Sequence, residues 1–206
     1  MKKYFVTAIG TDSGKTLVSA ILTEALQADY WKPIQCGLEF RDTDTVKSLV
    51  SNGFSFFHPE AYLFKTPASP HAAALLENKK IDLEKVLLPE TEDNNLIIEG
   101  AGGILVPLNE KAVIIDIAEK FGAEVILVSN LYLGSINHTL LSIEELKRRK
   151  LQVKGIIFNG EPNPASEDII LKKSGYKCLL KIIPEKEITP DIISKYAIKL
   201  FEHWDE

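Results

Sequence analysis

Apolar residues follow two different spacings along this chain. Short apolar runs, rich in β-branched and aromatic residues, alternate with longer segments in which apolar residues return every three or four positions. The short runs are typical of buried parallel strands, and the longer segments are typical of the amphipathic helices that connect them. The expected strands are residues 4–9, 30–34, 95–99, 124–129, 153–159 and 177–182. The expected helices are residues 14–26, 43–51, 71–78, 113–121, 136–150, 166–174 and 190–203.

This alternation predicts an α/β fold of three layers, in which helices cover both faces of a mostly parallel central sheet. Residues 54–70 are richer in Phe, Pro and Ser, and we expect them to wrap the sheet edge as irregular structure. No repeat or linker divides the chain, so residues 1–206 are expected to form a single domain. Ligands of open α/β sheets collect at the carboxyl ends of the strands, which is where chemistry should be sought.

The charge balance of the chain limits the classes of partner. Lys and Arg total 24 and Asp and Glu total 29, so the formal net charge is −5. A chain without a net positive field is a poor non-specific binder of nucleic acid, so any phosphate that it binds should belong to a small ligand at a local site. Hydrophobic residues make up 45% of the chain, which is enough for a buried core.

The sequence favours a cytoplasmic protein without a membrane segment. No apolar stretch of the chain approaches the ~18 residues that a membrane helix requires. The basic start and the apolar run after it resemble a signal peptide, but Asp12 and Lys15 stand where a cleavage region should be, so we expect a strand. Cys36 and Cys178 are too few for a disulfide framework and lack the spacing of a zinc site.

The first expected strand is followed by a glycine-rich loop and then by a helical pattern. The loop reads Gly-Thr-Asp-Ser-Gly-Lys-Thr at residues 10–16. In this context, backbone N–H groups and a helix N-terminus cradle phosphate oxygens, the Lys15 ammonium reaches the β and γ phosphates, and the Thr16 hydroxyl holds Mg²⁺. The sequence therefore predicts that residues 10–16 form a P-loop, which binds the phosphates of a nucleotide.

The P-loop motif is imperfect. The standard pattern has four residues between its first glycine and Gly-Lys, whereas Gly10 and Gly14 enclose three, and Ile9 stands where the standard glycine would be. A glycine-rich turn with a solvated lysine is the alternative interpretation. Signalling and partitioning ATPases of the deviant type carry an extra lysine early in the loop, and no lysine lies between Lys3 and Lys15.

Charged residues follow the next expected strands. Lys32 interrupts an apolar strand. Either its side chain extends from the sheet edge into solvent, or its strand lies beside the first strand, which would bring its ammonium group to a transferring phosphoryl group. Asp42 and Asp44 open the next expected helix, where capping and dipole roles can coexist with a metal role. Glu99 ends the third clear strand. P-loop enzymes place a magnesium-associated acid at such a position; alternatively, Glu99 is an acid at an exposed strand end without a metal role.

Five short runs together resemble the dethiobiotin synthetase family, in the same order. They are Gly-Thr-Asp-x-Gly-Lys-Thr at residues 10–16, Lys32-Pro33, Ser69-Pro70-His71, Glu99-Gly100-Ala101-Gly102-Gly103 and Leu133-Gly134-Ser135-Ile136-Asn137-His138. The resemblance implies a P-loop NTPase-like topology and an ATP-dependent cyclo-ligase of biotin biosynthesis. Carbon dioxide forms a carbamate on one amine of 7,8-diaminopelargonic acid, MgATP phosphorylates the carbamate, and the second amine closes the ring and expels phosphate.

The resemblance also implies roles for individual residues. The catalytic set is Lys15, Lys32 and Thr11. The Mg²⁺ set is Thr16, Asp44 and Glu99. The ATP set is Asp12, Ser13, Gly14, Lys15, Thr16, Leu17, Glu99, Gly102, Asn159, Pro184 and Glu185. The substrate set is Thr11, Lys32, Cys36, Gly102, Ser135, Ile136 and Asn137.

Two parts of the resemblance carry further expectations. Ser135, Ile136 and Asn137 would open a helix that in this family belongs to the other subunit, which implies a homodimer with shared sites; alternatively, Asn137 is an N-cap. Cys36 stands where the family usually has a hydroxyl, and a thiol is the weaker donor. His71 and His138 are expected to be structural.

Two other functions share the predicted fold. One is an ATP-dependent amidoligase of the cobyrinate type, which would normally carry an attached glutaminase domain for which this chain leaves no length. The other is a dimeric ATPase switch that binds protein or membrane partners, for which the sequence offers neither a deviant-loop lysine nor a basic amphipathic tail.

Overall fold

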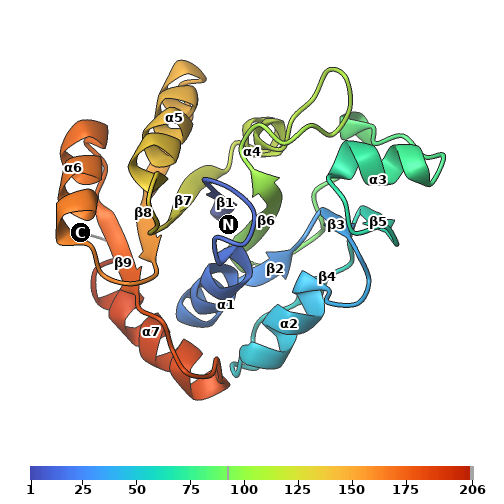
Figure 1. The fold of residues 1–206 in the computed structure, drawn as a ribbon. Helices are drawn as coiled ribbons and strands as arrows, with labels where there is room; N and C mark the ends of the chain where they lie inside the picture. The colour runs from blue at the N-terminus through green and yellow to red at the C-terminus, as the bar shows by residue number, and fades with distance from the viewer. Residues whose placement is uncertain (92, 205–206) are drawn as a thin grey trace.

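A seven-stranded sheet forms the middle layer of the molecule, with its strands in the order β4-β2-β6-β1-β7-β8-β9 (Figure 1). Each pair of neighbouring strands is parallel. This computed structural model describes residues 1–91 and 93–204. The strands of the sheet are β1 (Lys3–Ala8), β2 (Asp29–Trp31), β4 (Phe57–His58), β6 (Leu96–Gly103), β7 (Glu124–Asn130), β8 (Val153–Asn159) and β9 (Cys178–Ile182). A separate parallel pair consists of β3 (Ile34–Cys36) and β5 (Tyr62–Phe64).

Helices cover both faces of the sheet, as the hydrophobic pattern predicts. The helices are α1 (Lys15–Leu26), α2 (Asp42–Leu49), α3 (Pro70–Leu76), α4 (Ile115–Phe121), α5 (Ser135–Arg148), α6 (Pro164–Ser174) and α7 (Pro190–Glu202), with a short 3-10 turn η1 (Leu83–Lys85). The buried side chains of α1, α2 and α7 belong to one core cluster, whereas those of α3, α4, α5 and α6 belong to the other. The three-layer arrangement is therefore confirmed, and so is each of the seven expected helices, with ends shifted by up to two residues.

The two core clusters explain why the strands read as continuous apolar runs. Side chains of a strand alternate between its faces, and in β1 Phe5 packs into one cluster while Tyr4 and Val6 pack into the other. Neighbouring β6 does the same, with Ile98 on one side and Ile97 on the other. A sheet that is covered on both faces needs apolar residues at both parities.

The expected strand at residues 30–34 is wrong, because the chain leaves the central sheet in the middle of it. The first half forms β2, and the second half forms β3, which pairs with β5 instead. Pro33 stands at the break, and it has no N–H group to donate to a ladder. In addition, β6 lies between β2 and β1, so the second strand is not beside the first.

The expectation of irregular structure at residues 54–70 is wrong in part. This segment contains β4, which forms the edge of the central sheet beside β2, and β5, which pairs with β3. A ring contact and a hydrogen bond hold the edge in place: the ring centroids of Tyr30 and Phe57 lie 6.3 Å apart, and Trp31 Nε1 donates to Pro59 O at 3.0 Å.

None of the helices within residues 1–91 and 93–204 has the length and apolar content that a membrane crossing requires.

We expect Gly155→Ala to destabilise the fold by about 2 kcal/mol, because a Cβ in the middle of β8 forces a packed neighbour to move. That Cβ would lie 2.7 Å from Lys177 O and 2.7 Å from Leu179 Cγ, in the adjacent strand segment. Urea unfolding measures the change. Gly53→Ala is the matched control, since nothing lies within 4 Å of its added methyl group. Equal stabilities for the two variants would contradict the close packing of β8 on β9.

Candidate functional site

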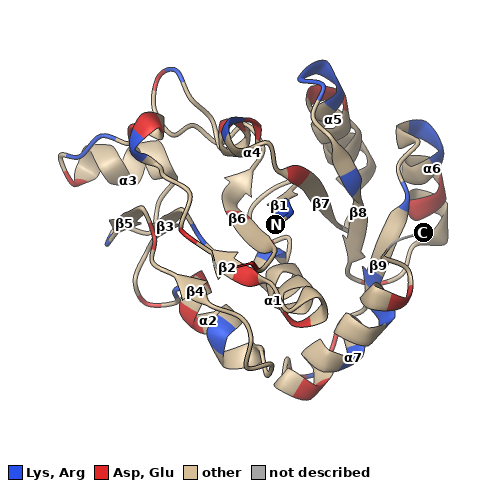
Figure 2. Ribbon diagram, turned by 180° about the vertical axis from the view of Figure 1, so that it is seen from behind, with Lys and Arg blue, Asp and Glu red and all other residues tan. Residues whose placement is uncertain are grey.

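A cavity of about 700 Å³ opens at the carboxyl end of the central strands. Its lining comes from the loop after β1, from the segment between β2 and α2, from the end of β6 and from the segment that leads into α3. The strands themselves carry few charges, which lie mostly on helices and loops (Figure 2). The charged groups that line the cavity are therefore exceptions in a largely apolar sheet layer.

The loop at residues 10–16 is braced from the other half of the sheet. Gly14 has φ +91°, a left-handed conformation, and an added Cβ would collide with the side-chain amide of Asn159. That amide, at the end of β8, donates to Ser13 O at 2.9 Å. Only glycine combines this φ with so close an approach. Helix α1 begins directly after the loop, so its unpaired first N–H groups lie at the cavity.

Lys15 turns back over this loop. Its Nζ donates to Gly10 O at 3.2 Å, and the residue is 7% exposed. Burial lowers the pKa of Lys15, and the charge of nearby Lys32 lowers it further. A cation that the protein only partly neutralises attracts anions, and the β and γ phosphates of a nucleotide are the anions that a P-loop lysine meets.

A compact group of charged and polar side chains lies beside the loop. Lys32 Nζ lies 2.6 Å from Asp42 Oδ2, 2.9 Å from Glu99 Oε1 and 3.0 Å from Gly100 O. Thr16 Oγ1 lies 2.9 Å from Asp42 Oδ1 and 3.0 Å from Glu99 Oε1. These side chains come from α1, α2, β6 and the end of β2, so four elements meet at one point.

The charges in this group stabilise one another. Lys32 and Glu99 are 3% and 1% exposed, so neither is solvated as a free ion would be. Burial alone would favour the neutral amine, but the carboxylates of Glu99 and Asp42 outweigh it and raise the pKa of Lys32. In the same way, Lys32 outweighs the effect of burial and lowers the pKa of Asp42. The buried ammonium is therefore a fixed positive charge at neutral pH.

Tyr30 belongs to this group, and the sequence analysis missed it. Its hydroxyl donates to Glu99 Oε2 at 2.9 Å, which leaves Oε1 for Lys32 and Thr16. Burial and the neighbouring Glu99 hold the pKa of Tyr30 well above its ordinary value, so the hydroxyl remains a donor. Its two-residue spacing from Lys32, which places both side chains on one face of an extended segment, was the available signal.

Two aspartates lie in the first turn of α2, and Asp44 is the expected magnesium ligand. Asp42, rather than Asp44, lies against Thr16 and Lys32. The Asp44 side chain is 66% exposed and lies 3.6 Å from Arg41 Nη1. Successive helical residues are about 100° apart, so positions two apart face nearly opposite directions. The apolar Val46, four residues after Asp42 and buried, marked the inward face in the sequence.

The remaining predicted residues divide into two groups. Those that line the cavity with the group described above are Thr11, Asp12, Ser13, Gly14, Cys36 and Gly102. Gly102 has φ +70°, and an added Cβ would lie 2.8 Å from Val106 Cγ2 and 3.7 Å from Thr11 Oγ1. Burial raises the pKa of the Cys36 thiol to about 11, so at neutral pH it is an uncharged, weak donor.

Several predicted residues do not line the cavity of this single chain. They are Leu17, Pro184, Glu185, Ser135, Ile136 and Asn137. Leu17 packs against the core below the loop, and Glu185 accepts from the Tyr196 hydroxyl at 2.8 Å. Asn159 acts on the loop rather than on the cavity lining.

Helix α5 begins at Ser135, as the resemblance implies. Gly134 is its N-cap, with φ +108°, so the alternative that Asn137 is an N-cap is wrong. His71 and His138, which are expected to be structural, lie outside the cavity lining. His138 Nδ1 bonds to the Tyr132 hydroxyl, and His71 Nδ1 bonds to the Ser69 hydroxyl.

Comparisons with known proteins identify the family. A family model described as an AAA domain matches residues 2–191. The ATP-dependent dethiobiotin synthetase BioD of Cytophaga hutchinsonii is 62% identical over 206 residues, which is 100% of each chain. The ATP-dependent dethiobiotin synthetase BioD of Christiangramia forsetii is 52% identical over 199 residues, covering 96% of this chain and 95% of the relative.

Solved structures show the same fold at much lower identity. The cell division ATPase MinD of Pyrococcus furiosus superposes with a TM-score of 0.62 at 17% identity, over 100% of this chain and 99% of that one. A ParA family ATPase of Chlorobium tepidum gives a TM-score of 0.60 at 12% identity, over 98% of this chain and 97% of that one. Both likenesses support the P-loop topology of the sheet.

Proposed function

This chain belongs to the ATP-dependent dethiobiotin synthetase family, and we propose that it forms dethiobiotin, ADP and phosphate from 7,8-diaminopelargonic acid, carbon dioxide and ATP. The observation that carries the proposal is the group of Lys32, Asp42, Glu99 and Thr16 beside a braced phosphate loop, in which Lys32 and Glu99 are buried. Relatives at 62% and 52% identity favour this reaction over a cobyrinate-type amidoligase or an ATPase switch.

ATP binding follows from the loop at residues 10–16. The first N–H groups of α1 and the turns of the loop offer donors to the β and γ phosphates, and Lys15 supplies a positive charge beside them. Asp12, Ser13 and Gly102 would border the nucleotide. The family resemblance places Pro184 and Glu185 in the ATP set, and they lie outside the cavity lining, so we propose that they contact the adenine base beyond the phosphates.

A magnesium ion fits the oxygen donors beside the loop. Magnesium takes oxygen ligands and is bound in proteins by one or two carboxylates together with substrate phosphates. Thr16, Asp42 and Glu99 present such oxygens from three elements, and we propose that they hold the ion. When bound, it would neutralise phosphate charge and orient the γ-phosphoryl group.

The reaction needs positioned charges rather than a covalent enzyme intermediate. One substrate amine attacks carbon dioxide and loses a proton, which gives a carbamate. A carbamate oxygen attacks the γ-phosphorus as ADP leaves, and the second amine then attacks the carbonyl carbon as phosphate leaves. We propose that Lys15 and Lys32 stabilise the negative charge on the phosphoryl and carbamate oxygens, and that Thr11 and Cys36 contact the substrate.

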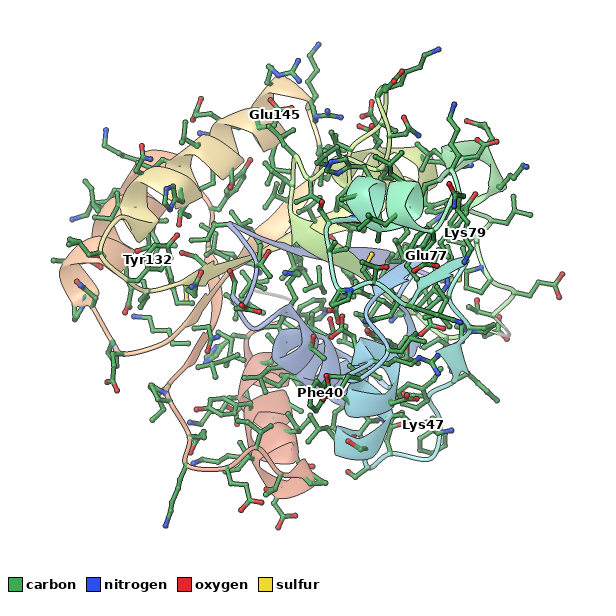
Figure 3. The ribbon with its side chains drawn as sticks, turned by 45° about the vertical axis from the view of Figure 1, so that its right-hand side comes forward. Phe40, Lys47, Glu77, Lys79, Tyr132 and Glu145 are labelled. Carbon is green, nitrogen blue, oxygen red and sulfur yellow. The ribbon has the colours of Figure 1, made fainter. Side chains whose placement is uncertain are left out.

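We also propose that the chain acts as one domain, in a homodimer, in the cytoplasm. Leu133 is 103% exposed and Leu141 61% exposed, so apolar side chains of α5 and the loop before it face outward. Tyr132, in the same loop, is also exposed (Figure 3). The N-terminus of α5, residues 135–137, would then serve a partner's cavity and bind the substrate carboxylate. The free thiols of Cys36 and Cys178 suit a reducing compartment.

Phosphate release tests the proposed reaction. Purified protein with MgATP should release phosphate only when diaminopelargonic acid and bicarbonate are both present, because the phosphoryl acceptor is the carbamate. Omission of either one is the control. Release at an equal rate without the diamine would overturn the synthetase proposal.

Asp42→Asn should raise the Mg²⁺ concentration for half-maximal activity at least about tenfold, because the amide replaces a charged ligand of the ion. Asp44→Asn is the matched control, and we expect it to change this concentration by less than about twofold, since exposed ion pairs contribute little. Magnesium titrations of both variants measure the difference. A larger effect from Asp44→Asn would favour Asp44, the ligand expected from the resemblance, over Asp42.

Lys32→Gln should lower turnover about 100-fold or more, because the charge that faces the transferred phosphoryl group is lost. The loss of the counter-charge should destabilise the protein by up to about 3–5 kcal/mol, but the glutamine amide keeps a donor for Glu99 or Asp42 and offsets part of that cost. Circular dichroism and urea unfolding check that the variant is folded under the assay conditions. Near-normal turnover in a folded variant would show that Lys32 is only a buried counter-charge.

A further inference from the structure

Both charged and apolar residues line the cavity. The P-loop, Lys32, Asp42 and Glu99 supply the charged groups. The apolar part of the lining includes Ile34, Phe40, Pro67, Ala68, Ala101 and Val106. The proposed substrate also has a polar and an apolar part, because a chain of methylene groups separates its reacting amines from its carboxylate. An apolar wall beside the charged group therefore matches the unreactive part of this molecule.

Phe40 is an exposed member of this apolar lining. It lines the cavity and yet is 81% exposed, and it lies near helices α1 and α2 (Figure 3). An aromatic ring in water gains free energy when an apolar group covers it, at roughly 25 cal/mol per Å² removed from water. A bound methylene chain would supply that cover, and the phosphates of ATP would not.

The segment that carries Phe40 is fixed at both ends. We call residues 37–41 the β3–α2 loop. The amide of Gln35, a residue that is 4% exposed, donates to Gly37 O at 3.1 Å and accepts from Asp42 N at 3.2 Å, so one side chain spans the loop. Arg41 Nη2 binds both carboxylate oxygens of Glu60, at 2.9 and 2.8 Å. The loop ends are held before a ligand arrives, which lowers the entropic cost of using Phe40 as a contact.

We propose that Phe40 is a specificity-determining residue that covers the methylene chain of the diamine substrate. The inference rests on the proposed function. It adds a residue, Phe40, whose contact with the methylene chain makes substrate affinity depend on the length of that chain. Because Asp42 follows directly after the β3–α2 loop, the apolar contact and the charged group are set by one short segment. Substrates with a longer apolar stretch beside Phe40 would thus bind more tightly in the productive position.

Steady-state kinetics of Phe40→Ala test the proposal. We expect the KM for the diamine to rise about fivefold to tenfold, while kcat and the KM for ATP stay within about twofold, because only an apolar ground-state contact is lost. Phe40→Leu should recover most of the affinity, since it keeps an apolar side chain. With a diamino acid that has fewer methylene groups before its carboxylate, the ratio of KM values between Phe40→Ala and wild type should fall toward one.

Phe54→Ala is the matched control, because Phe54 is 63% exposed and does not line the cavity. Four outcomes would each overturn this inference. The diamine KM could be unchanged in Phe40→Ala, or it could rise equally in Phe54→Ala. Alternatively, Phe40→Ala could raise the ATP KM instead, or the ratio of diamine KM values could be independent of substrate length. Each of these outcomes leaves the diamine-dependent phosphate release of the wild type, and with it the proposed function, unaffected. A wild type that releases no diamine-dependent phosphate would overturn the proposed function as well.

Discussion

One buried ammonium group holds the reactive edge of the sheet together. Lys32 Nζ lies between Asp42 and Glu99, at 2.6 and 2.9 Å, and it ties the end of β2 to β6 and to the first turn of α2. Removing one partner from such a group leaves a buried charge unpaired, which costs about 3–5 kcal/mol. The three elements therefore keep their relative positions, and the P-loop threonine, Thr16, meets both carboxylates from a fourth.

The elements of this fold could be predicted from local pattern, but their order could not. Apolar runs and helical periodicity identified all seven helices and the long central strands, because burial on both faces imposes a spacing that the sequence displays. The insertion of β6 between β1 and β2 depends on contacts between distant segments. The short β4 and β5 were missed because two or three residues are too few to show a period.

The site shows the same division at the level of single residues. Lys15 and Thr16 could be predicted because a motif marks them, and Glu99 because it follows an apolar run, although β6 continues past it to Gly103. The family resemblance pointed to Asp44, but helix phase decides which aspartate faces inward, and Asp42 is the one that lies against Thr16 and Lys32. Tyr30 has no motif, since its role depends on the neighbouring strand that carries Glu99. The apolar wall and the contact of Asn159 with the loop likewise arise only from tertiary structure.

The brace between Asn159 and the phosphate loop also bears on how the protein is made. The two ends of that hydrogen bond, Asn159 Nδ2 and Ser13 O, are 146 residues apart in the chain, and β1 has its neighbours in β6 and β7 rather than in β2. A ribosome delivers the loop early, long before either neighbour strand or the bracing amide exists. The braced form of the phosphate loop can therefore exist only after Asn159 at the end of β8 has emerged, so most of this protein is synthesised before the loop is braced.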